Sequence, residues 1–523
     1  MESQKSFYVP DILQKRADLT PDRIALHSAS THRDTTYGEW NMIANRTANF
    51  LVSLGVQHGD RVAVYASNSF EYLDIWMACG KIGAILQNLN WRLTVAELTE
   101  LLKDATPKLL FYSDEFMEQV NTLRGKVESI SHYIGIYQRA QSTDLGLSGR
   151  DAYADELIYR PTIHPDDPWI ICYTGGTTGL PKGAILTHGN MNFNAVNTVM
   201  SWGLDQNDVA VLNAPMFHTG GLNVFTLPLI HAGGKSIVCK TFDAGQVFDL
   251  IHNKGVTVYF GVPTMFIVMQ QHPFWDSADF SKLKIVISGG APCPMPVFEK
   301  FWAKGVDFKT GYGLTEAGPN TFWLPPADVR RKPGAVGKAL IHIDVKVVDI
   351  DVHEDGDIHE CAPNVAGELI IRGPHVTTGY WNNPEATAKT IVDGWLHTGD
   401  LAIRDDEGYY TIVGRLKDMI ISGGENIYPS EVESAMHAHP SIAEATLIGI
   451  PDTKWGEVGV AVCVLKHGYA LSEETLQIFL KDRLAKYKIP KRVIFVEELP
   501  KTGAGKIDKK VLVTKYARMQ VEG

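Results

Sequence analysis

The alternation of short apolar runs with segments of helical length constrains the fold of this chain more than any other feature. Four runs rich in β-branched residues end in glycine-, proline- or asparagine-rich loops, at residues 61–68, 209–215, 257–263 and 284–292. Segments such as FEYLDIWMACGKIGAIL lie between them. This alternation is typical of βαβ units around mostly parallel sheets, which bind ligands where the strands end in loops. We therefore predict an α/β fold.

The pattern of expected strands and helices changes twice toward the C-terminus. Short strands with polar turns occupy about residues 335–413, which predicts a β-rich subdomain. After GRLKD at 414–418, a helix beginning near Pro429, three strands and a helix around residues 473–486 form another series. We expect a large N-terminal domain over residues 1–414 and a small α+β C-terminal domain over residues 415–523.

Charge and composition exclude several classes of partner. The 523 residues contain 49 Lys and Arg against 60 Asp and Glu, a net charge of −11, and no basic block. A nucleic-acid partner is therefore not expected. The N-terminal sequence lacks the apolar region of a signal peptide. The stretch 209–234 has no charged residue, but prolines, glycines and histidines interrupt it too often for a transmembrane segment, so we interpret it as buried interior.

The cysteines favour a cytoplasmic location. Six cysteines are scattered without CxxC or Cys/His ligand spacing, and several lie in apolar runs such as WIICYT and GVAVCVLK. We interpret them as reduced core residues rather than disulfides or a zinc site.

The segment YTGGTTGLPKG, residues 173–183, is the first candidate binding loop. A P-loop requires adjacent glycine and lysine, whereas Leu180 and Pro181 intervene here. Glycines can still turn several backbone N–H groups toward one point, while hydroxyls and a lysine add donors and charge. A mobile hairpin tip is the structural alternative to polyphosphate binding. The residues concerned are Thr174, Gly175, Thr177, Thr178 and Lys182.

Other segments could complete a nucleotide site. In GYGLTE (311–316), Tyr312 could stack on a purine and Glu316 could bind Mg²⁺. In GWLHTGD (394–400), Asp400 could accept hydrogen bonds from a ribose. GRLKD adds Arg415, and PKTGAGK adds Lys506 near the end of the chain. Taken alone, each of these residues also has an ordinary structural explanation, as a packed aromatic ring, a solvent-exposed charge or the side chain of an Asx-turn.

Together and in this order, the segments resemble the adenylate-forming superfamily, most closely its acyl-CoA synthetases. PMFHTGGL, GYWNNPEAT and the continuation MIISGGENIYPSEVE extend the resemblance over nearly the whole chain. It implies a C-terminal domain that moves about a hinge, and two half-reactions. A carboxylate and MgATP give acyl-adenylate and pyrophosphate, and a thiol then attacks the adenylate. The implied cofactor is Mg²⁺, with ATP and CoA as co-substrates.

The resemblance also implies roles for individual residues. The nucleotide contacts would be Thr174, Gly175, Thr177, Thr178 and Lys182 at the phosphates, Gly290, Ala291 and Tyr312 at adenine, Thr315 at the AMP phosphate, and Asp400 and Arg415 at the ribose. Glu316 would be the magnesium ligand, and Lys506 would bridge the carboxylate and the α-phosphate. The remaining roles would fall to His218 as a gate beside the acyl carboxylate, Lys417 as the hinge residue, and Gly423 and Gly424 at the pantetheine tunnel.

We therefore predict an ATP-dependent ligase that joins a hydrophobic carboxylic acid to CoA. The alternatives are an enzyme that loads a carrier protein, an oxidative light-emitting relative and a non-catalytic nucleotide sensor. Phe217, Phe225 and Leu227 offer apolar walls without a counter-charge, which disfavours an amino-acid substrate. Fatty and aryl acids both fit. A homodimer is possible, by analogy with relatives.

Overall fold

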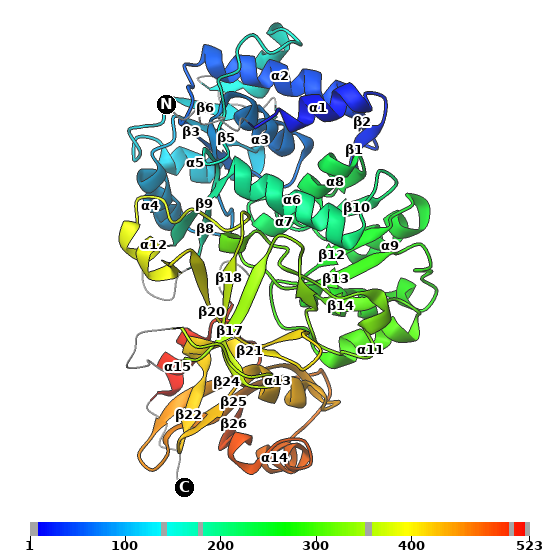
Figure 1. Cartoon of the computed structure of the whole chain (residues 1–523), viewed down its shortest axis with the longest axis vertical. Helices are drawn as coiled ribbons and strands as arrows, with labels where there is room; N and C mark the ends of the chain where they lie inside the picture. The colour runs from blue at the N-terminus through cyan, green and yellow to red at the C-terminus, as the bar shows by residue number, and fades with distance from the viewer. Residues whose placement is uncertain (1–8, 138–143, 176–180, 351–357, 502–506, 518–523) are drawn as a thin grey trace.

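The N-terminal domain is built on two seven-stranded sheets, which lie side by side in Figure 1, the first on the left and the second on the right. The computed structural model describes residues 9–137, 144–175, 181–350, 358–501 and 507–517. The strand order of the first sheet is β7-β6-β5-β3-β4-β8-β9, and only the last pair is antiparallel. Its strands are β3 (Arg61–Tyr65), β4 (Ile85–Asn88), β5 (Leu109–Tyr112), β6 (His132–Gly135), β7 (Leu145–Gly146), β8 (Pro168–Thr174) and β9 (Lys182–Thr187).

The second sheet combines the start of the chain with residues from its middle. Its order is β14-β13-β12-β10-β11-β1-β2, parallel except for the pair β1 and β2. Its strands are β1 (Ile24–Ser28), β2 (Asp34–Thr36), β10 (Val209–Leu212), β11 (Lys235–Val238), β12 (Val258–Gly261), β13 (Ile285–Ser288) and β14 (Phe308–Thr310). The four apolar runs predicted as strands correspond to β3, β10, β12 and β13, which confirms the α/β prediction.

Local capping signals set where several helices begin. Capping boxes, in which the cap side chain and the third helical residue bond each other's backbone, start α2, α4 and α6 at Thr36, Thr94 and Thr187. The helices that accompany the two sheets are α1 (Ile12–Leu19), α2 (Tyr37–Ser53), α3 (Phe70–Ile82), α4 (Val95–Ala105), α5 (Met117–Leu123), α6 (His188–Trp202), α7 (Thr219–Asn223), α8 (Thr226–Ala232), α9 (Ala244–Asn253), α10 (Pro263–Gln271) and α11 (Met295–Ala303).

One apolar core joins both sheets and fixes their relative position. It contains strand residues from each sheet together with the fully buried Trp40 and Trp76. Trp76 stacks on Trp169 with ring centroids 5.3 Å apart, and Gly80 of α3 makes room for this pair. A Cβ at Gly80 would lie 2.6 Å from the Trp169 ring, so a larger residue would force the helix away from the sheet.

The predicted β-rich subdomain is an antiparallel sheet between these layers and the C-terminal domain (Figure 1). It consists of β17 (Asp344–Val348), β18 (Ala366–Arg372), β19 (Ile391–Val392), β20 (Trp395–Arg404) and β21 (Tyr410–Arg415). A short pair, β15 (Phe322–Trp323) and β16 (Lys338–Ala339), precedes it, and α12 (Pro384–Thr390) lies within it in sequence.

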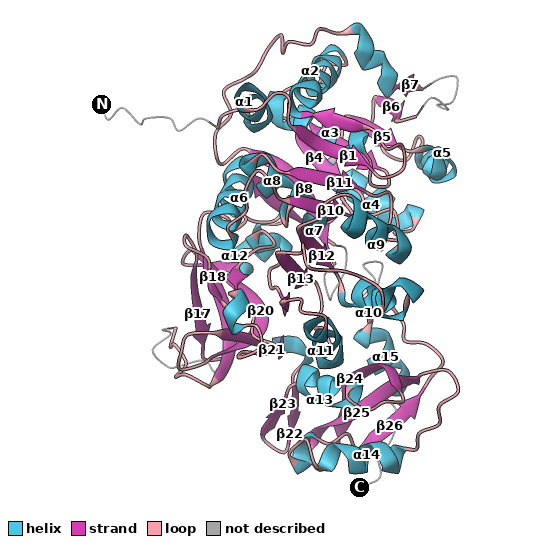
Figure 2. Ribbon diagram, turned by 90° about the vertical axis from the view of Figure 1, so that its right-hand side faces the viewer, coloured by secondary structure: helices cyan, strands magenta, loops and turns pink. Residues whose placement is uncertain are grey.

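The C-terminal domain has a five-stranded sheet and its own apolar clusters. Its elements are β22 (Ile420–Ser422), β23 (Glu425–Ile427), α13 (Pro429–His437), β24 (Ile442–Asp452), β25 (Gly456–Leu465), α14 (Glu473–Lys481), β26 (Arg492–Phe495) and α15 (Lys509–Tyr516). The helix predicted near Pro429 and the three predicted strands are therefore confirmed. α13 packs against β21 and α11 (Figure 2). The Ser430 hydroxyl donates to the carbonyl of Val413.

The structure bears on the membrane, uncharged-stretch and cysteine expectations as well. Among the residues that it describes, no helix is both long enough and apolar enough to cross a membrane. The uncharged stretch 209–234 forms β10, α7, α8 and the connections between them, and most of it is buried. All six cysteines carry free thiols, and Cys79, Cys172, Cys239 and Cys463 are buried, in agreement with reduced core residues.

Candidate active site

The candidate phosphate loop connects two paired strands. β8 ends at Thr174 and β9 begins at Lys182, and these two residues are partners in the antiparallel register. The Thr174 hydroxyl lies 3.4 Å from the carbonyl oxygen of Lys182. Gly175 has open space where a side chain would be. Thr177 and Thr178 lie outside the described residues. The strand pairing thus holds both ends of the loop at one edge of the sheet.

Glu316 is buried beside this loop. The sequence placed it in a glycine-flanked loop, and the structure places it in a 3₁₀ turn, Thr315–Ala317, with 9 % of its surface exposed. Its carboxylate oxygen Oε1 accepts hydrogen bonds from the Thr174 hydroxyl at 3.3 Å and the Tyr380 hydroxyl at 2.9 Å. A buried carboxylate needs such donors, because losing hydration without them would be costly.

Tyr380 is a functional candidate that the residue-by-residue prediction did not include. Its segment, GYWNNPEAT, entered only as part of the family resemblance. Burial and the nearby Glu316 charge raise the pKa of Tyr380 above its usual range, so the hydroxyl stays protonated and donates. The Lys182 ammonium lies over the Tyr380 ring, 5.0 Å from its centroid. Sequence alone gave no sign that these three side chains meet.

The Glu316 carboxylate fits one magnesium ligand position. Both described hydrogen bonds reach Oε1, which leaves Oε2 for a further ligand. Mg²⁺ is usually bound through one or two carboxylates plus substrate phosphates rather than by a cage of protein side chains. Within the described part of the chain no group of three or more potential metal ligands occurs. A single carboxylate beside a phosphate loop matches this mode of binding.

Tyr312, Asp400 and Arg415 form a second cluster. The Tyr312 hydroxyl donates to Asp400 Oδ2 at 2.7 Å, and Arg415 Nε lies 3.2 Å from Oδ1. Asp400 and Arg415 are also partners in the register of β20 and β21. Burial, and then the Asp400 charge, raise the pKa of Tyr312 well above its usual range. Side chains predicted from three separate segments therefore meet, although Tyr312 also packs against Phe322.

The backbone around Asp400 is held by hydrogen bonds from β18. Thr398 Oγ1 donates to the Leu369 carbonyl at 2.6 Å and accepts from the Asp400 N–H at 3.0 Å. The Glu368 carboxylate accepts from the Gly399 N–H at 2.9 Å and contacts His397 Nδ1 at 2.8 Å. Bonding to Glu368 raises the pKa of His397. These contacts lie where the register between β18 and β20 shifts, next to Asp400 in the chain.

The predicted adenine residues lie where three parallel strands end. Gly290 and Ala291 follow β13 and are exposed, and Gly290 adopts a positive φ of 80°. The Gly311 N–H donates to the Ser288 carbonyl at 2.7 Å, which brings the loop containing Tyr312 and Thr315 alongside. Loops at the carboxyl ends of parallel strands are the usual ligand sites of such sheets.

His218, the predicted gate residue, directly precedes α7 as its N-cap. Its ring lies 4.7 Å from that of Phe217, which meets Trp91 edge-on at 5.8 Å. Phe217, Phe225 and Leu227, expected as apolar walls, are all buried. Phe225 packs on Trp202 at 5.7 Å, and Leu227 is fully buried in the core that joins the two sheets. Both were selected from an uncharged run that also supplies core side chains.

Phe260 is an acyl-site candidate that the sequence did not single out. It is half-buried at the end of β12. A Cβ at Gly220 would lie 3.3 Å from its ring and a Cβ at Gly289 only 3.0 Å from it. Gly220 of α7 and Gly289, which follows β13, therefore allow the ring to pack closely against their backbones.

The predicted hinge and tunnel residues lie beyond β21. Lys417 lies in a 3₁₀ turn, Leu416–Asp418, and partial burial lowers its pKa. Gly423 and Gly424 form the two-residue turn between β22 and β23, with φ of 62° and 85°. The Gly423 N–H donates to the Trp455 carbonyl at 2.7 Å, within the C-terminal sheet. Lys506 lies outside the described residues.

This chain is similar to known proteins of one family. The family described as AMP-binding enzyme matches residues 13–381, and its C-terminal domain matches residues 431–506. Feruloyl-CoA synthase of Amycolatopsis sp. is 40 % identical, covering 94 % of this chain and 96 % of the relative. Indoleacetate–CoA ligase of Aromatoleum aromaticum is 37 % identical, covering 95 % and 96 %.

Among solved structures, ATP-bound MatB from Rhodopseudomonas palustris matches with a TM-score of 0.88 and 33 % identity, covering 97 % of this chain and 99 % of that one. The similarity thus extends over both domains. The chain belongs to the AMP-binding enzyme family and is an acyl-CoA synthetase of the adenylate-forming superfamily.

Proposed function

We propose that this protein activates a hydrophobic carboxylic acid with ATP and transfers the acyl group to CoA. The observation that carries the proposal is the meeting of Thr174, Lys182 and Glu316 at one loop. A second cluster, Tyr312, Asp400 and Arg415, is suited to the nucleoside. Family membership and the CoA ligases among the relatives support the same reaction.

In the first half-reaction, a carboxylate oxygen of the acid forms a bond to the α-phosphorus of ATP. The bond between the α-phosphorus and the oxygen that joins it to the β-phosphate breaks, and pyrophosphate leaves. Two anions must meet, so the chain's contribution is charge neutralisation and positioning. We assign Lys182, Thr174, Gly175, Thr177 and Thr178 to the phosphates. Bound Mg²⁺ would neutralise phosphate charge, with Glu316 as its protein ligand. No proton is transferred, and the proposal needs no general base.

Asp400 and Arg415 are proposed to hold the ribose, and Tyr312, Gly290 and Ala291 the adenine. Tyr312 is fixed by its bond to Asp400, so base and sugar would be positioned together. Thr315 is assigned to the AMP phosphate, because it directly precedes Glu316 in the same turn.

The second half-reaction is proposed to use a different face of the C-terminal domain. We place the domain boundary at residues 414 and 415, where the β-rich sheet ends, with Lys417 as the hinge. The turn at Gly423 and Gly424 is bonded to Trp455 within the C-terminal sheet, so it would move with the domain as a unit, and rotation of the domain is proposed to bring it to the pantetheine tunnel. Lys506 is assigned to the first half-reaction, between the carboxylate and the α-phosphate.

The acid is proposed to bind beside His218, against Phe217 and Phe260. Its class is best resolved by assay, because aromatic walls suit aryl and fatty acids alike. Location in the cytoplasm is part of the proposal, supported by the six free thiols. The homodimer stays a prediction.

The test measures pyrophosphate release with MgATP and single acids, followed by mass spectrometry of the CoA products. The panel contains ferulate, indoleacetate, benzoates and fatty acids of increasing length. We expect release that depends on the acid, and an acyl-CoA product when CoA is added. Acyl-AMP without a CoA thioester would support loading of a carrier protein instead. ATP binding without any pyrophosphate release across the panel would support a sensor.

A further inference from the structure

Tyr380 touches both halves of the proposed phosphate and metal site. Its hydroxyl donates to Glu316 Oε1 at 2.9 Å, and its ring lies under the Lys182 ammonium, 5.0 Å from the centroid. Glu316 and Lys182 come from segments far apart in the sequence. Tyr380 is the side chain described as contacting both of them.

The backbone around Tyr380 is held in place from both sides. Tyr380 forms an antiparallel bridge with Ala184 of β9, and the Ile185 N–H donates to the Gly379 carbonyl at 2.9 Å. On the other side, the Thr377 N–H donates to the Glu316 carbonyl at 2.7 Å. The segment 377–380 therefore links the strand after the phosphate loop to the turn that carries Glu316.

We propose that Tyr380 is a positioning residue that holds the Glu316 carboxylate and the Lys182 ammonium in a fixed relation. The inference rests on the proposed function, because it takes Glu316 as the magnesium ligand and Lys182 as a phosphate contact. By bonding Oε1, the hydroxyl directs the other oxygen of Glu316 toward the position of the metal. By lying under the ammonium, the ring limits where the lysine can move.

The two parts of Tyr380 have separable consequences. Tyr380→Phe removes the hydroxyl and keeps the ring, so Glu316 loses a hydrogen-bond donor while the ring contact with the Lys182 ammonium remains. Tyr380→Leu removes both. Losing a hydrogen bond to a charged group typically weakens the interaction about tenfold or more. We therefore expect Tyr380→Phe to affect metal-dependent binding selectively, and Tyr380→Leu to weaken metal-free ATP binding as well.

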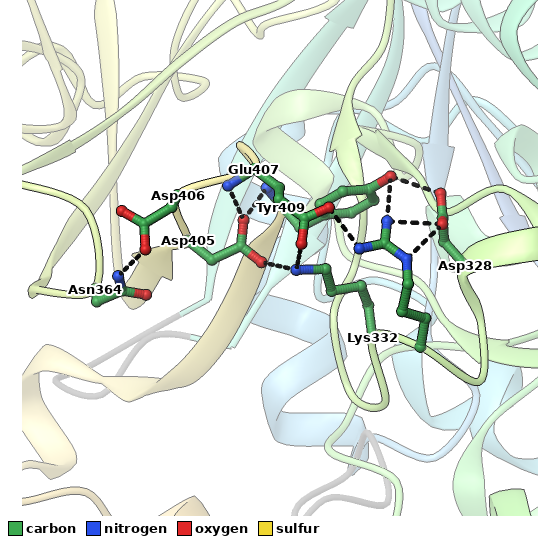
Figure 3. Close-up of polar contacts among 8 residues, drawn as sticks. Asp328, Lys332, Asn364, Asp405, Asp406, Glu407 and Tyr409 are labelled. Atoms are coloured by element: carbon green, nitrogen blue, oxygen red, sulfur yellow. Dashed lines mark hydrogen bonds and ion pairs between the residues drawn. The ribbon is translucent and has the colours of Figure 1, made fainter.

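Tyr409→Phe is a matched control in the same chain. The Tyr409 hydroxyl also donates to a carboxylate, Asp328 at 2.5 Å, and the Lys332 ammonium lies 5.1 Å from its ring centroid. Figure 3 shows this cluster at the turn between β20 and β21, with Lys332 also paired to Asp405. The same substitution is thus made in a similar environment, at a site to which no role in the reaction is assigned.

The experiment titrates the full-length protein, without acid, with MgATP and with ATP in EDTA, using calorimetry. We expect Tyr380→Phe to weaken MgATP binding about tenfold and to leave metal-free ATP binding within about twofold of wild type. The Mg²⁺ concentration for half-maximal pyrophosphate release should rise by the same factor, with kcat recovered at saturating Mg²⁺. Tyr409→Phe should change neither quantity.

A double-mutant cycle with Glu316→Gln tests whether the effect passes through Glu316. In the Glu316→Gln background, Tyr380→Phe should have no further effect on metal dependence. Wild-type-like MgATP binding by folded Tyr380→Phe, or equal weakening of both forms of ATP, would overturn the inference. Failure of the proposed function would differ, because the wild-type protein itself would then lack acid-dependent pyrophosphate release. Circular dichroism and denaturation midpoints verify that each variant folds.

Discussion

Replacing Asp400 by asparagine should raise the KM for ATP about 100-fold while the protein still folds. Asp400 is 7 % exposed. Its Oδ2 accepts a hydrogen bond from the Tyr312 hydroxyl at 2.7 Å, and its Oδ1 lies 3.2 Å from Arg415 Nε. In the proposed complex, two ribose hydroxyls would bond the same carboxylate. Asparagine keeps the shape of the side chain, so the strand pairing between β20 and β21 should persist.

The magnitude follows from counting acceptor positions. A carboxylate offers about four, and an amide oxygen only about two, so two bonds to a charged acceptor are lost when nucleotide binds. Each such bond contributes about 1.5 kcal/mol at the lower end of its range. We use the lower end because the Arg415 side chain is 50 % exposed, and water can replace part of its bond. Two bonds give about 3 kcal/mol, which corresponds to roughly 100-fold in affinity.

The assay is ATP–pyrophosphate exchange at saturating acid, with the KM for ATP and the KM for the acid measured separately. Asp405→Asn is the matched control, because Asp405 lies at the far end of the same strand pair and contacts Lys332 at 2.6 Å (Figure 3). It should leave both constants unchanged. A rise in the KM for ATP of less than about threefold would refute the ribose assignment. An equal rise in both KM values would instead indicate a general structural effect.

Three other substitutions test separate parts of the reasoning. Lys506→Ala should slow acyl-AMP formation by a factor on the order of 10²–10³ and leave conversion of supplied acyl-AMP to acyl-CoA near wild type; equal loss in single-turnover assays of both steps would contradict its assignment. Lys417→Pro should slow thioester formation more than adenylation, because proline fixes φ near −65° at the proposed hinge. Equal slowing of acyl-AMP formation and of thioester formation from supplied acyl-AMP would contradict the hinge assignment. Burial lowers the pKa of Lys309 to about 7, so the unfolded chain binds more protons between pH 7 and 10 and the stability of the wild type should rise across that range. Lys309→Met should lack this contribution, and denaturation midpoints of both proteins at pH 7 and 9.5 measure it.

The sequence by itself determined the elements and the loops that carry chemistry. Runs such as 61–68 and 284–292 alternate with helical segments, and their β-branched composition together with the turn residues that end them is sufficient to recognise them as strands. The helix at Pro429 is likewise local, because proline suits the first turn of a helix. The binding segments were also recognisable, since glycines, hydroxyls and charges occur within a few residues of each other.

Only the tertiary structure decided which of these residues meet. The sheet that contains β1 and β2 also contains β10 to β14, and no local pattern in residues 24–36 indicates partners near residue 235. Phe217, Phe225 and Leu227 have the composition of a pocket wall, and only the packing shows that all three side chains are buried. Apolar side chains serve both purposes, and burial depends on the whole fold.

Tyr380 shows the same limit at the candidate site. The distance in sequence from Tyr380 to Glu316 is 64 residues, and from Thr174 to Glu316 it is 142. Such contacts form because separate strands and turns are fixed by the packing of their own sheets, and the side chains then meet at the edges. Sequence patterns report each segment's own preferences, whereas the contact energy between segments exists only once the chain has closed the long loops between them.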